Sequence, residues 1–395
     1  MPRQTPLAWY NLTSSWRKCL LSASGVAFAV VLMFMQIGFR GALIDNNVRI
    51  LSLFDLDYAN LAVISRARYN LTTEQRFSRY LLEAIAGRPT ITDVTIVQLE
   101  RGTAKVKVAG HRAKPIRVMA VDIEARRMFA DASLWQRLQA AQRQGAALVD
   151  RRSKPSYGFA AREEQLLAQS VELNGQQLPL LGFFELGTDF SSDGTLLLTP
   201  DVFAEYFPWR NGAGSANGII DIGLLHADVD RAEELSTVAA DLQSLAPAQI
   251  QVLPTAELIA AEKRFWLQAT PIGKIFTIGT LLGFVVGAII CYQLLFTDIT
   301  EHLPEFATLQ AMGYSSRYFV SLVLWQSLYL SCLGFLPGLL VSLGLYQVLT
   351  ATSGLYMSMP VSRVALVFLL TTLMCILSGL IAMRKLYRAD PASLF

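Results

Sequence analysis

Residues 275–297 read IFTIGTLLGFVVGAIICYQLLFT, a run of 23 residues without a charged side chain. Lys274 precedes this run and Asp298 follows it. A helix of about 20 apolar residues crosses the roughly 30 Å of hydrocarbon in a lipid bilayer. The sequence therefore predicts a membrane-spanning helix over 271–297.

Three further uncharged runs extend this interpretation outward along the chain. Residues 19–39 and 364–383 each have the length of one span, whereas the uncharged run 318–362 is long enough for two. The third run is most apolar up to about residue 346, and Thr, Ser, Gly and Pro residues then accumulate, so we expect one span and a short loop. The predicted transmembrane helices are 19–43, 271–297, 318–346 and 364–383, with the short loop over 347–363.

The charged residues are concentrated between the first two spans. The chain has 53% hydrophobic and 16% charged residues, whereas soluble domains carry about 25% charged residues. Residues 44–270 hold 24 of the 34 Lys and Arg and 27 of the 31 Asp and Glu. This segment therefore has the composition of a soluble domain, and the remainder has that of a membrane protein. The net charge of +3 gives no reason to expect a nucleic-acid partner.

Basic residues flank the outer ends of the first and last spans. Arg17 and Lys18 precede the first span, and Arg384 and Lys385 follow the last. Lys and Arg accumulate on the cytoplasmic side of membrane proteins. We therefore expect both termini in the cytoplasm and the domain over 44–270 outside it.

The two tails carry weaker signals. Trp9, Leu12 and Trp16 lie at helical spacing, which predicts a helix in the cytoplasmic membrane interface over 1–18. A belt of interfacial aromatic residues without a helix explains the same spacing. Residues 384–395 are predicted to form a cytoplasmic C-terminal tail.

The external segment mixes strand and helix patterns. We predict strands over 94–99 and 104–108, joined as a hairpin. Asn174-Gly175 predicts a second hairpin, between 171–173 and 177–181. A strand over 219–225, a helix over 230–245 and a strand over 250–253 form a βαβ pattern. The expectation is an α+β domain between the first and second spans, with an inserted lobe over about 122–218.

Small residues recur at helical spacing in two spans. Gly279, Gly283 and Gly287 lie four residues apart in the second span, and Gly334 and Gly338 do so in the third. Such ridges allow a second helix to approach closely. We predict helix packing at all five glycines. Packing within one subunit fits this spacing, and so does the seam of a homodimer on the first three glycines.

The predicted cytoplasmic loop over 298–317 contains a short amphipathic helix over 304–313. Pro304 suits the first helical position, Glu305 the positive end of the helix dipole, and Gly313 the C-terminal cap. Phe306 and Leu309 fall on one face. A helix that contacts only lipid has the same pattern.

The sequence contains none of the common motifs for catalysis or nucleotide binding. It has no G-x-x-x-x-G-K-[ST], no H-E-x-x-H and no C-x-x-C, and its three histidines are scattered. These motifs hold phosphates, metals or reactive groups. We expect the chain not to be an enzyme by itself and to bind no cofactor.

The arrangement of one span, a large external domain and three further spans resembles the permeases of the MacB/FtsX/LolC class of ABC systems. The closing residues 382–395, AMRKLYRADPASLF, are similar to the C-terminal Asp-Pro signature of that class. Residues 305–313, EFATLQAMG, are similar to its coupling motif, in which four positions match. The matching residues are Glu305, Leu309, Ala311 and Gly313.

A narrower resemblance is to the DevC-type permeases of cyanobacterial exporters. The similar stretches are PLAW at 6–9, FMQIGFR at 34–40, FWLQATPIG at 265–273 and HLP at 302–304. They cover both membrane parts of the chain, and no motif matches within 122–218.

This resemblance implies a MacB-like fold. It also implies that the chain is the permease subunit of an ATP-driven tripartite exporter in the inner membrane of a bacterium, specifically a cyanobacterium. A DevA-like ABC ATPase that binds ATP and Mg²⁺ would dock on the short cytoplasmic helix. A DevB-like adaptor would bind the periplasmic domain, and a TolC-like outer-membrane channel would receive the cargo, a glycolipid or another amphiphile. The permease would form a homodimer. The residues implied in ATPase coupling are Pro304, Glu305, Phe306, Leu309, Ala311 and Gly313.

Two other functions fit the same arrangement of helices. FtsX-like proteins regulate a cell-wall hydrolase without transport, and LolC-like proteins extract lipoproteins. The identity of co-purifying partners distinguishes the three functions.

Overall fold

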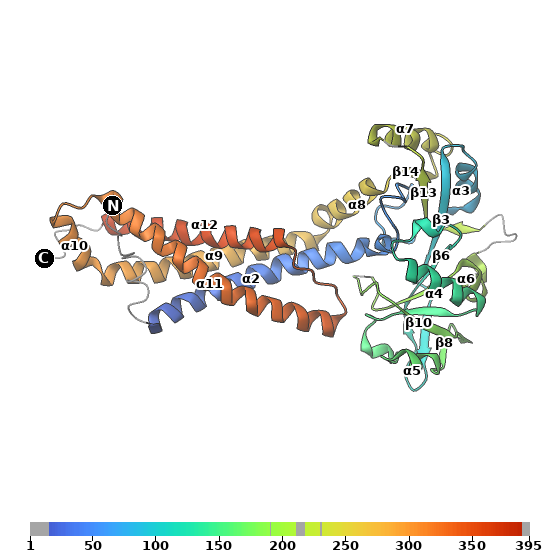
Figure 1. Ribbon diagram of the computed structural model, residues 1–395, viewed down its shortest axis with the longest axis horizontal. Coiled ribbons are helices and arrows are strands. Elements are labelled where there is room, and N and C mark those ends of the chain that lie inside the picture. Colours follow the sequence, from blue (N-terminus) through green and yellow to red (C-terminus); the bar gives the residue numbers. More distant parts are fainter. Residues whose placement is uncertain (1–15, 190, 211–217, 230, 389–395) are drawn as a thin grey trace. The chain divides into compact units, whose positions relative to one another are not determined.

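The computed structural model describes residues 16–189, 191–210, 218–229 and 231–388 of the chain (Figure 1). Residues 1–15 of the predicted interfacial helix lie outside these residues. Residues 389–395 of the predicted C-terminal tail also lie outside them. The chain divides into two compact units. The helical unit comprises Met1–Gly41, Pro271–Val348 and Met357–Phe395, and the α/β unit comprises Ala42–Thr270 and Leu349–Tyr356.

Four helices are long and apolar enough to cross a membrane, among the residues that the structure describes. They are α2 (Trp16–Val48), α9 (Pro271–Glu301), α11 (Ser316–Ser353) and α12 (Val361–Arg388). Helix α2 has 33 residues and is therefore about 50 Å long at ~1.5 Å per residue. This is more than the roughly 30 Å that a span requires.

Every one of these helices extends beyond its predicted span. The predicted limits follow the uncharged runs, whereas a helix continues through polar residues as long as its backbone hydrogen bonds continue. The clearest difference is at 347–353, which was predicted as loop and belongs to α11. The loop before α12 is therefore limited to 354–360.

Apolar side chains hold the helices of the helical unit together. Its central cluster combines residues of α2, α9, α11 and α12, among them Val30, Cys291, Phe335 and Met374. Other large apolar side chains of these helices, such as Leu340 of α11, are exposed. An apolar outer surface around an apolar core is what a lipid environment requires.

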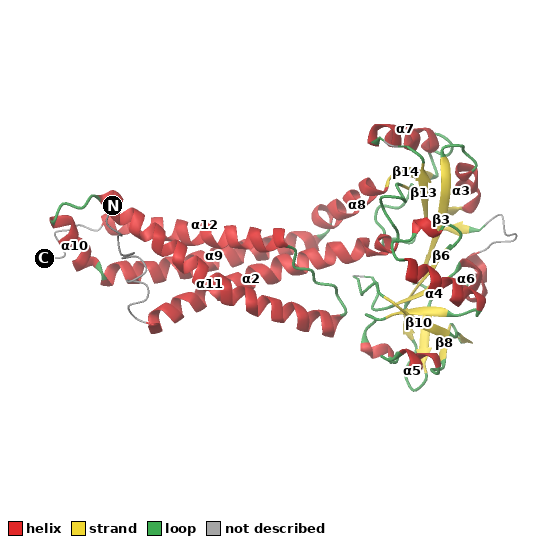
Figure 2. Cartoon of the chain, viewed as in Figure 1, coloured by secondary structure: helices red, strands yellow, loops and turns green. Residues whose placement is uncertain are grey.

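The α/β unit is built on one eight-stranded sheet, which Figure 2 shows in yellow. The strand order is β10-β7-β11-β6-β3-β13-β1-β14. Strands β10 and β7 pair in parallel, as do β11 and β6, and the other neighbours are antiparallel. The strands are β1 (Leu61–Ser65), β3 (Ile91–Glu100), β6 (Arg117–Val121), β7 (Ala147–Asp150), β10 (Leu180–Phe184), β11 (Thr195–Leu198), β13 (Ile222–Ala227) and β14 (Ile250–Pro254).

The predicted lobe over 122–218 is not a separate sheet. This segment supplies β7, β10 and β11 to the same sheet that β1 and β3 belong to. No local sequence pattern indicates this, because the joining pair, β11 with β6, brings together residues nearly 80 positions apart. The βαβ pattern is present, but β1 lies between its two strands, β13 and β14.

A smaller four-stranded sheet has the order β5-β4-β8-β9. Its strands are β4 (Lys105–Val108), β5 (Lys114–Pro115), β8 (Val171–Leu173) and β9 (Gln176–Gln177). The hairpin at Asn174-Gly175 is confirmed: β8 pairs with β9, and the two turn residues have φ of 52° and 83°, as a type I′ turn requires. The predicted hairpin between 94–99 and 104–108 is wrong, because β3 pairs with β13 and β6, and β4 pairs with β5 and β8.

Helices and alternating side chains complete the core of the α/β unit. Along β1, Ala62 and Ile64 belong to one apolar cluster and Leu61 and Val63 to another, so both faces of the sheet are covered. A two-stranded sheet pairs β2 (Phe77–Ser78) with β12 (Ile219–Ile220). The helices are α3 (Arg79–Ala86), α4 (Ala132–Arg143), α5 (Glu163–Leu167), α6 (Pro200–Tyr206), α7 (Ala232–Gln243) and α8 (Thr255–Arg264).

Candidate functional site

The short helix α10 (Leu303–Ala311) lies between α9 and α11 in the chain and at one end of the helical unit (Figure 1). His302 separates it from α9, and the His302 amide donates a hydrogen bond to the carbonyl oxygen of Asp298 over 3.2 Å. Pro304 is therefore the second residue of α10 and not the first. Its missing N–H costs nothing there, because the first turn of a helix has no acceptor for it.

The end of α10 depends on a glycine. Gly313 has a φ of +95°, a left-handed conformation that glycine adopts without a steric penalty. The amide of Tyr314 donates to the carbonyl oxygen of Leu309 over 3.2 Å, and that of Met312 donates to Thr308 over 3.1 Å. These bonds occupy carbonyl groups that a helix end otherwise leaves without partners.

The two faces of α10 have different surroundings. Leu309 is half-buried and packs against an apolar cluster that includes Ile299 of α9 and Phe319 of α11. Glu305 is exposed, and so is Met312, with 64% of its surface accessible. Leu309 therefore contacts neighbouring helices of its own chain, and the outward face is formed by other residues.

This geometry changes the roles expected for the predicted coupling residues. A partner docked on α10 would reach Glu305 and Met312 directly and would act on Leu309 only through the helix. The sequence had not singled out Met312. Phe306 and Ala311 belong to α10, and their side chains lie outside the part of the chain that the structure describes.

A polar contact ties the α10 end of α9 to α11. The side-chain amide of Gln326 donates a hydrogen bond to the carboxylate of Asp298. Gln326 is 1% exposed, so this bond lies among packed helices, where polar contacts are shielded from water. The ends of α9 and α11 that flank α10 are thereby held together.

The predicted helix-packing glycines contact α2 of the same chain. A Cβ atom at Gly334 would lie 2.5 Å from Cβ of Val26, and one at Gly338 would lie 2.7 Å from Cγ1 of Val30. Both distances are shorter than any ordinary van der Waals contact. Only glycine therefore permits α11 to approach α2 this closely.

The ridge on α9 also faces α2. Added Cβ atoms would lie 2.5 Å from Oε1 of Gln36 at Gly279, and 2.6 Å from Cβ of Ala29 at Gly287. At Gly283 the nearest atom is Cβ of Leu32 at 3.6 Å, an ordinary contact. A helix of the same chain occupies this face, so the structure favours packing within one subunit over a homodimer seam on these three glycines.

The segment after α11 makes contacts that the sequence did not indicate. Thr188 donates hydrogen bonds from its amide to the carbonyl oxygen of Gly354 and from its hydroxyl to that of Ser353, over 3.3 and 3.1 Å. The guanidinium carbons of Arg49 and Arg152 lie 4.3 and 4.9 Å from the centre of the Tyr356 ring. The α/β unit thus holds the residues that connect α11 to α12.

No three side chains of His, Cys, Asp or Glu gather to form a metal site within the described ranges. Residues 276–391 match a protein family described as FtsX-like permease C-terminal. This range includes α10 and all five packing glycines. This part of the chain is similar to that family. No curated protein matches the chain.

Two solved structures are similar to parts of the chain. The periplasmic region of MacB from Actinobacillus actinomycetemcomitans is 13% identical, over 54% of this chain and 95% of that chain, with a TM-score of 0.34. The extracellular domain of the noncanonic ABC-type transporter YknZ from Gram-positive bacteria is 11% identical, over 49% of this chain and 100% of that chain, with a TM-score of 0.32.

Proposed function

We propose that the chain is the permease subunit of an ABC-type exporter in a bacterial inner membrane, with both termini in the cytoplasm and the α/β unit in the periplasm. One observation carries this proposal: α10, with an exposed outer face, lies between two span-length helices inside the FtsX-like region. A short helix in this position offers a partner a surface that is directly joined to two spans.

The partner in this proposal is a separate ABC ATPase, which binds ATP and Mg²⁺. It docks on the outer face of α10, where Glu305 and Met312 are exposed. Movement of α10 then reaches α9 and α11 through the packing of Leu309 against Ile299 and Phe319. Because α11 continues to Ser353, the same movement acts on the segment that the α/β unit holds.

The resemblance to DevC-type permeases supports the remaining partners. A DevB-like periplasmic adaptor binds the α/β unit and passes cargo to a TolC-like outer-membrane channel. The cargo is a glycolipid or another amphiphile. The permease works as a homodimer, with contacts on helix faces other than the glycine ridge of α9.

Cross-linking in native membranes followed by affinity purification tests this proposal. Recovery of an ABC ATPase together with an adaptor and a channel supports export. A double substitution on the outer face of α10, Glu305→Lys with Met312→Asp, should abolish recovery of the ATPase. A matched change in the exposed loop after α10, Ser315→Ala, should leave it unchanged.

The same purification separates the alternatives. A cell-wall hydrolase recovered in place of the adaptor and channel indicates an FtsX-like regulator, and a lipoprotein carrier indicates LolC-like extraction. If no ATPase is recovered with the unmodified chain, the proposal is wrong.

A further inference from the structure

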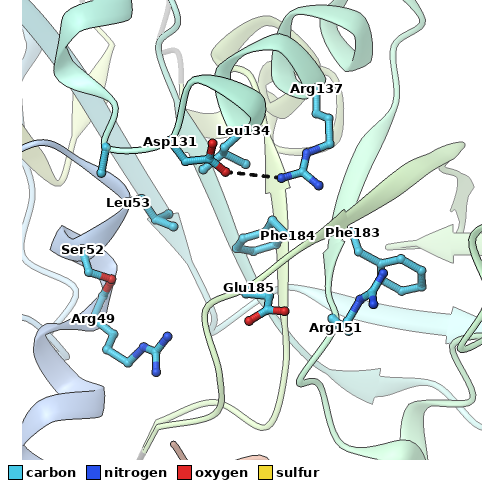
Figure 3. Close-up of a pocket in the computed structure, with 11 residues that line it drawn as sticks. Arg49, Ser52, Leu53, Asp131, Leu134, Arg137, Arg151, Phe183, Phe184 and Glu185 are labelled. Carbon is cyan, nitrogen blue, oxygen red and sulfur yellow. Dashed lines mark hydrogen bonds and ion pairs between the residues drawn. The ribbon is translucent and has the colours of Figure 1, made fainter.

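A cavity of about 560 Å³ lies in the α/β unit (Figure 3). It opens to solvent and is lined by the 3₁₀ turn η1 (Arg49–Leu53), the start of α4, the residue after β7, and the end of β10. Sites for small ligands usually have volumes of about 300–1,000 Å³. This cavity therefore has room for a small molecule or for the head group of a larger one.

Five charged side chains line the cavity, and two of the arginines are not matched by a carboxylate. Asp131 lies 3.6 Å from Nη2 of Arg137. Glu185 pairs with Arg152, over 3.2 Å. Arg49 and Arg151 make no ion pair with any residue that the structure describes. The lining thus has a surplus of positive charge.

Both unmatched arginines contact an aromatic ring. The guanidinium carbon of Arg49 lies 4.3 Å from the centre of the Tyr356 ring, and that of Arg151 lies 4.9 Å from the centre of the Phe183 ring. An arginine stacked on a ring keeps the N–H groups at its edge available for an anion. Stacking also restricts the side chain before any ligand arrives, which reduces the entropy lost on binding.

One donor shows this availability directly. Nη1 of Arg49 is buried and has no hydrogen-bond partner among the described residues. A buried donor without an acceptor is costly, and a charged donor more so. An anion in the cavity would supply the missing acceptor.

The surrounding carboxylates do not remove the positive surplus. In Figure 3 the Glu185 carboxylate lies between the side chains of Arg49 and Arg151, and Arg152 also pairs with it. Asp150, which is buried near the cavity, accepts hydrogen bonds from the amides of Leu186 and Gly187 over 3.0 and 2.8 Å. Two carboxylates, Glu185 and Asp150, therefore lie near three guanidinium groups, those of Arg49, Arg151 and Arg152.

We propose that this cavity binds a phosphate group, held by the guanidinium groups of Arg49 and Arg151. Guanidinium groups match the planar spacing of phosphate oxygens and bind them with charge-assisted hydrogen bonds. The phosphate belongs either to the head group of an amphiphile or to a free phosphate compound. Its role as a part of the cargo rests on the proposed function, whereas binding itself does not.

Calorimetric titration of the full chain in dodecyl maltoside, a neutral detergent without phosphate, tests this site. The probes are inorganic phosphate and hexyl phosphate, with hexyl glucoside as the uncharged comparison. Hexyl phosphate that binds more tightly than inorganic phosphate identifies an amphiphile head group as the ligand. Equal affinities identify a free phosphate compound. Both results support the site when hexyl glucoside does not bind.

Three substitutions at charged residues make the test specific. Arg151→Gln should weaken phosphate binding about 10-fold or more, the loss of one charge-assisted hydrogen bond. Glu185→Gln should strengthen binding several-fold, because it removes the competing carboxylate. Arg143→Gln, at the far end of α4 and outside the cavity lining, removes the same charge and should change nothing.

The opposite directions expected for the first two variants exclude a loss of folding as the cause. Affinity that is unchanged by both Arg151→Gln and Glu185→Gln overturns the proposal, and so does the absence of binding by either phosphate probe. This titration uses no partner protein, so a negative result would not contradict the proposed ATPase partner. In the same way, failure to recover an ATPase would not contradict phosphate binding.

Discussion

The guanidinium carbon of Arg49 lies 4.3 Å from the centre of the Tyr356 ring, although 307 positions separate the two residues in the chain. Arg152 approaches the same ring to 4.9 Å, and the side-chain amide of Asn46 donates to the Tyr356 carbonyl oxygen over 3.3 Å. The short segment between α11 and α12 is thus held by three side chains from two distant parts of the α/β unit.

Replacing Tyr356 with Leu should loosen this segment. The change removes two cation–π contacts, each worth roughly 0.5–2 kcal/mol, and keeps an apolar side chain. We expect faster hydrogen–deuterium exchange at the Thr188 amide, which donates to Gly354. Tyr80→Leu is the matched control, because Tyr80 is 65% exposed. Exchange at Thr188 that is equal in both variants would show that the ring contacts do not hold the segment.

The glycines of α11 should differ sharply in their tolerance of alanine. A Cβ at Gly338 would lie 3.0 Å from the carbonyl oxygen of Ala27, whereas one at Gly344 meets no atom within 4 Å. Gly338→Ala should therefore destabilise the helical unit by about 1–3 kcal/mol, the usual effect of overpacking. Gly344→Ala should be neutral or stabilising by up to about 1 kcal/mol. Thermal unfolding in detergent measures both, and equal midpoints would contradict the close packing of α11 against α2.

These glycines also show how far the sequence alone could lead. Their four-residue spacing correctly predicted a close helix approach, and the uncharged runs predicted the four long helices. Spacing along one helix carries no information about which helix faces it, so the contact with α2 was not distinguishable from a dimer seam. The same limit applies to Leu309, whose periodicity identified an apolar face but not its neighbours.

The α/β unit shows a second limit, which is sequence separation. The Asn174-Gly175 hairpin was predictable because its turn residues must adopt positive φ, a local requirement. The place of β3 in the centre of the sheet depends on β13 and β6, which lie far along the chain. The cavity could not be predicted either, because Arg49 and Arg151 come together only through that sheet and have no motif of their own.

Substitutions on the two faces of α10 should have different effects: those on the exposed face should change partner binding, and those on the packed face should change stability. Leu309→Ala removes packing against the cluster around Phe319 and should lower the stability of the helical unit by roughly 1–2 kcal/mol, less than for a fully buried Leu. Glu305→Ala alters an exposed side chain and should leave stability unchanged while it reduces ATPase recovery. Unfolding midpoints and cross-linking yields measure the two effects. A loss of stability in Glu305→Ala would show that this residue is part of the fold.

Acid should weaken the α/β unit through Asp189. Burial raises the pKa of this carboxyl, but Arg117 and the hydroxyl and amide of Ser191 lower it more, so its pKa in the folded protein lies below the ordinary value of 3.8. A group with a lowered pKa contributes stability that is complete above its ordinary pKa and is lost as the pH falls through the folded value.

Asp189→Asn isolates this contribution. At pH 6 the substitution leaves the buried Arg117 without its partner, which should destabilise the unit by about 3–5 kcal/mol. The stability gap between the unmodified chain and the variant should be constant above pH 5 and should narrow below about pH 4, because protonation then neutralises Asp189 in the unmodified chain as well. Asp193→Asn is the control, since Asp193 forms an exposed pair with Lys154 worth less than about 1 kcal/mol. Unfolding followed by hydrogen–deuterium exchange in β6 and β11 measures the gap. A gap of the same size at pH 6 and pH 3 would mean that the Asp189 carboxylate does not stabilise the fold through its charge.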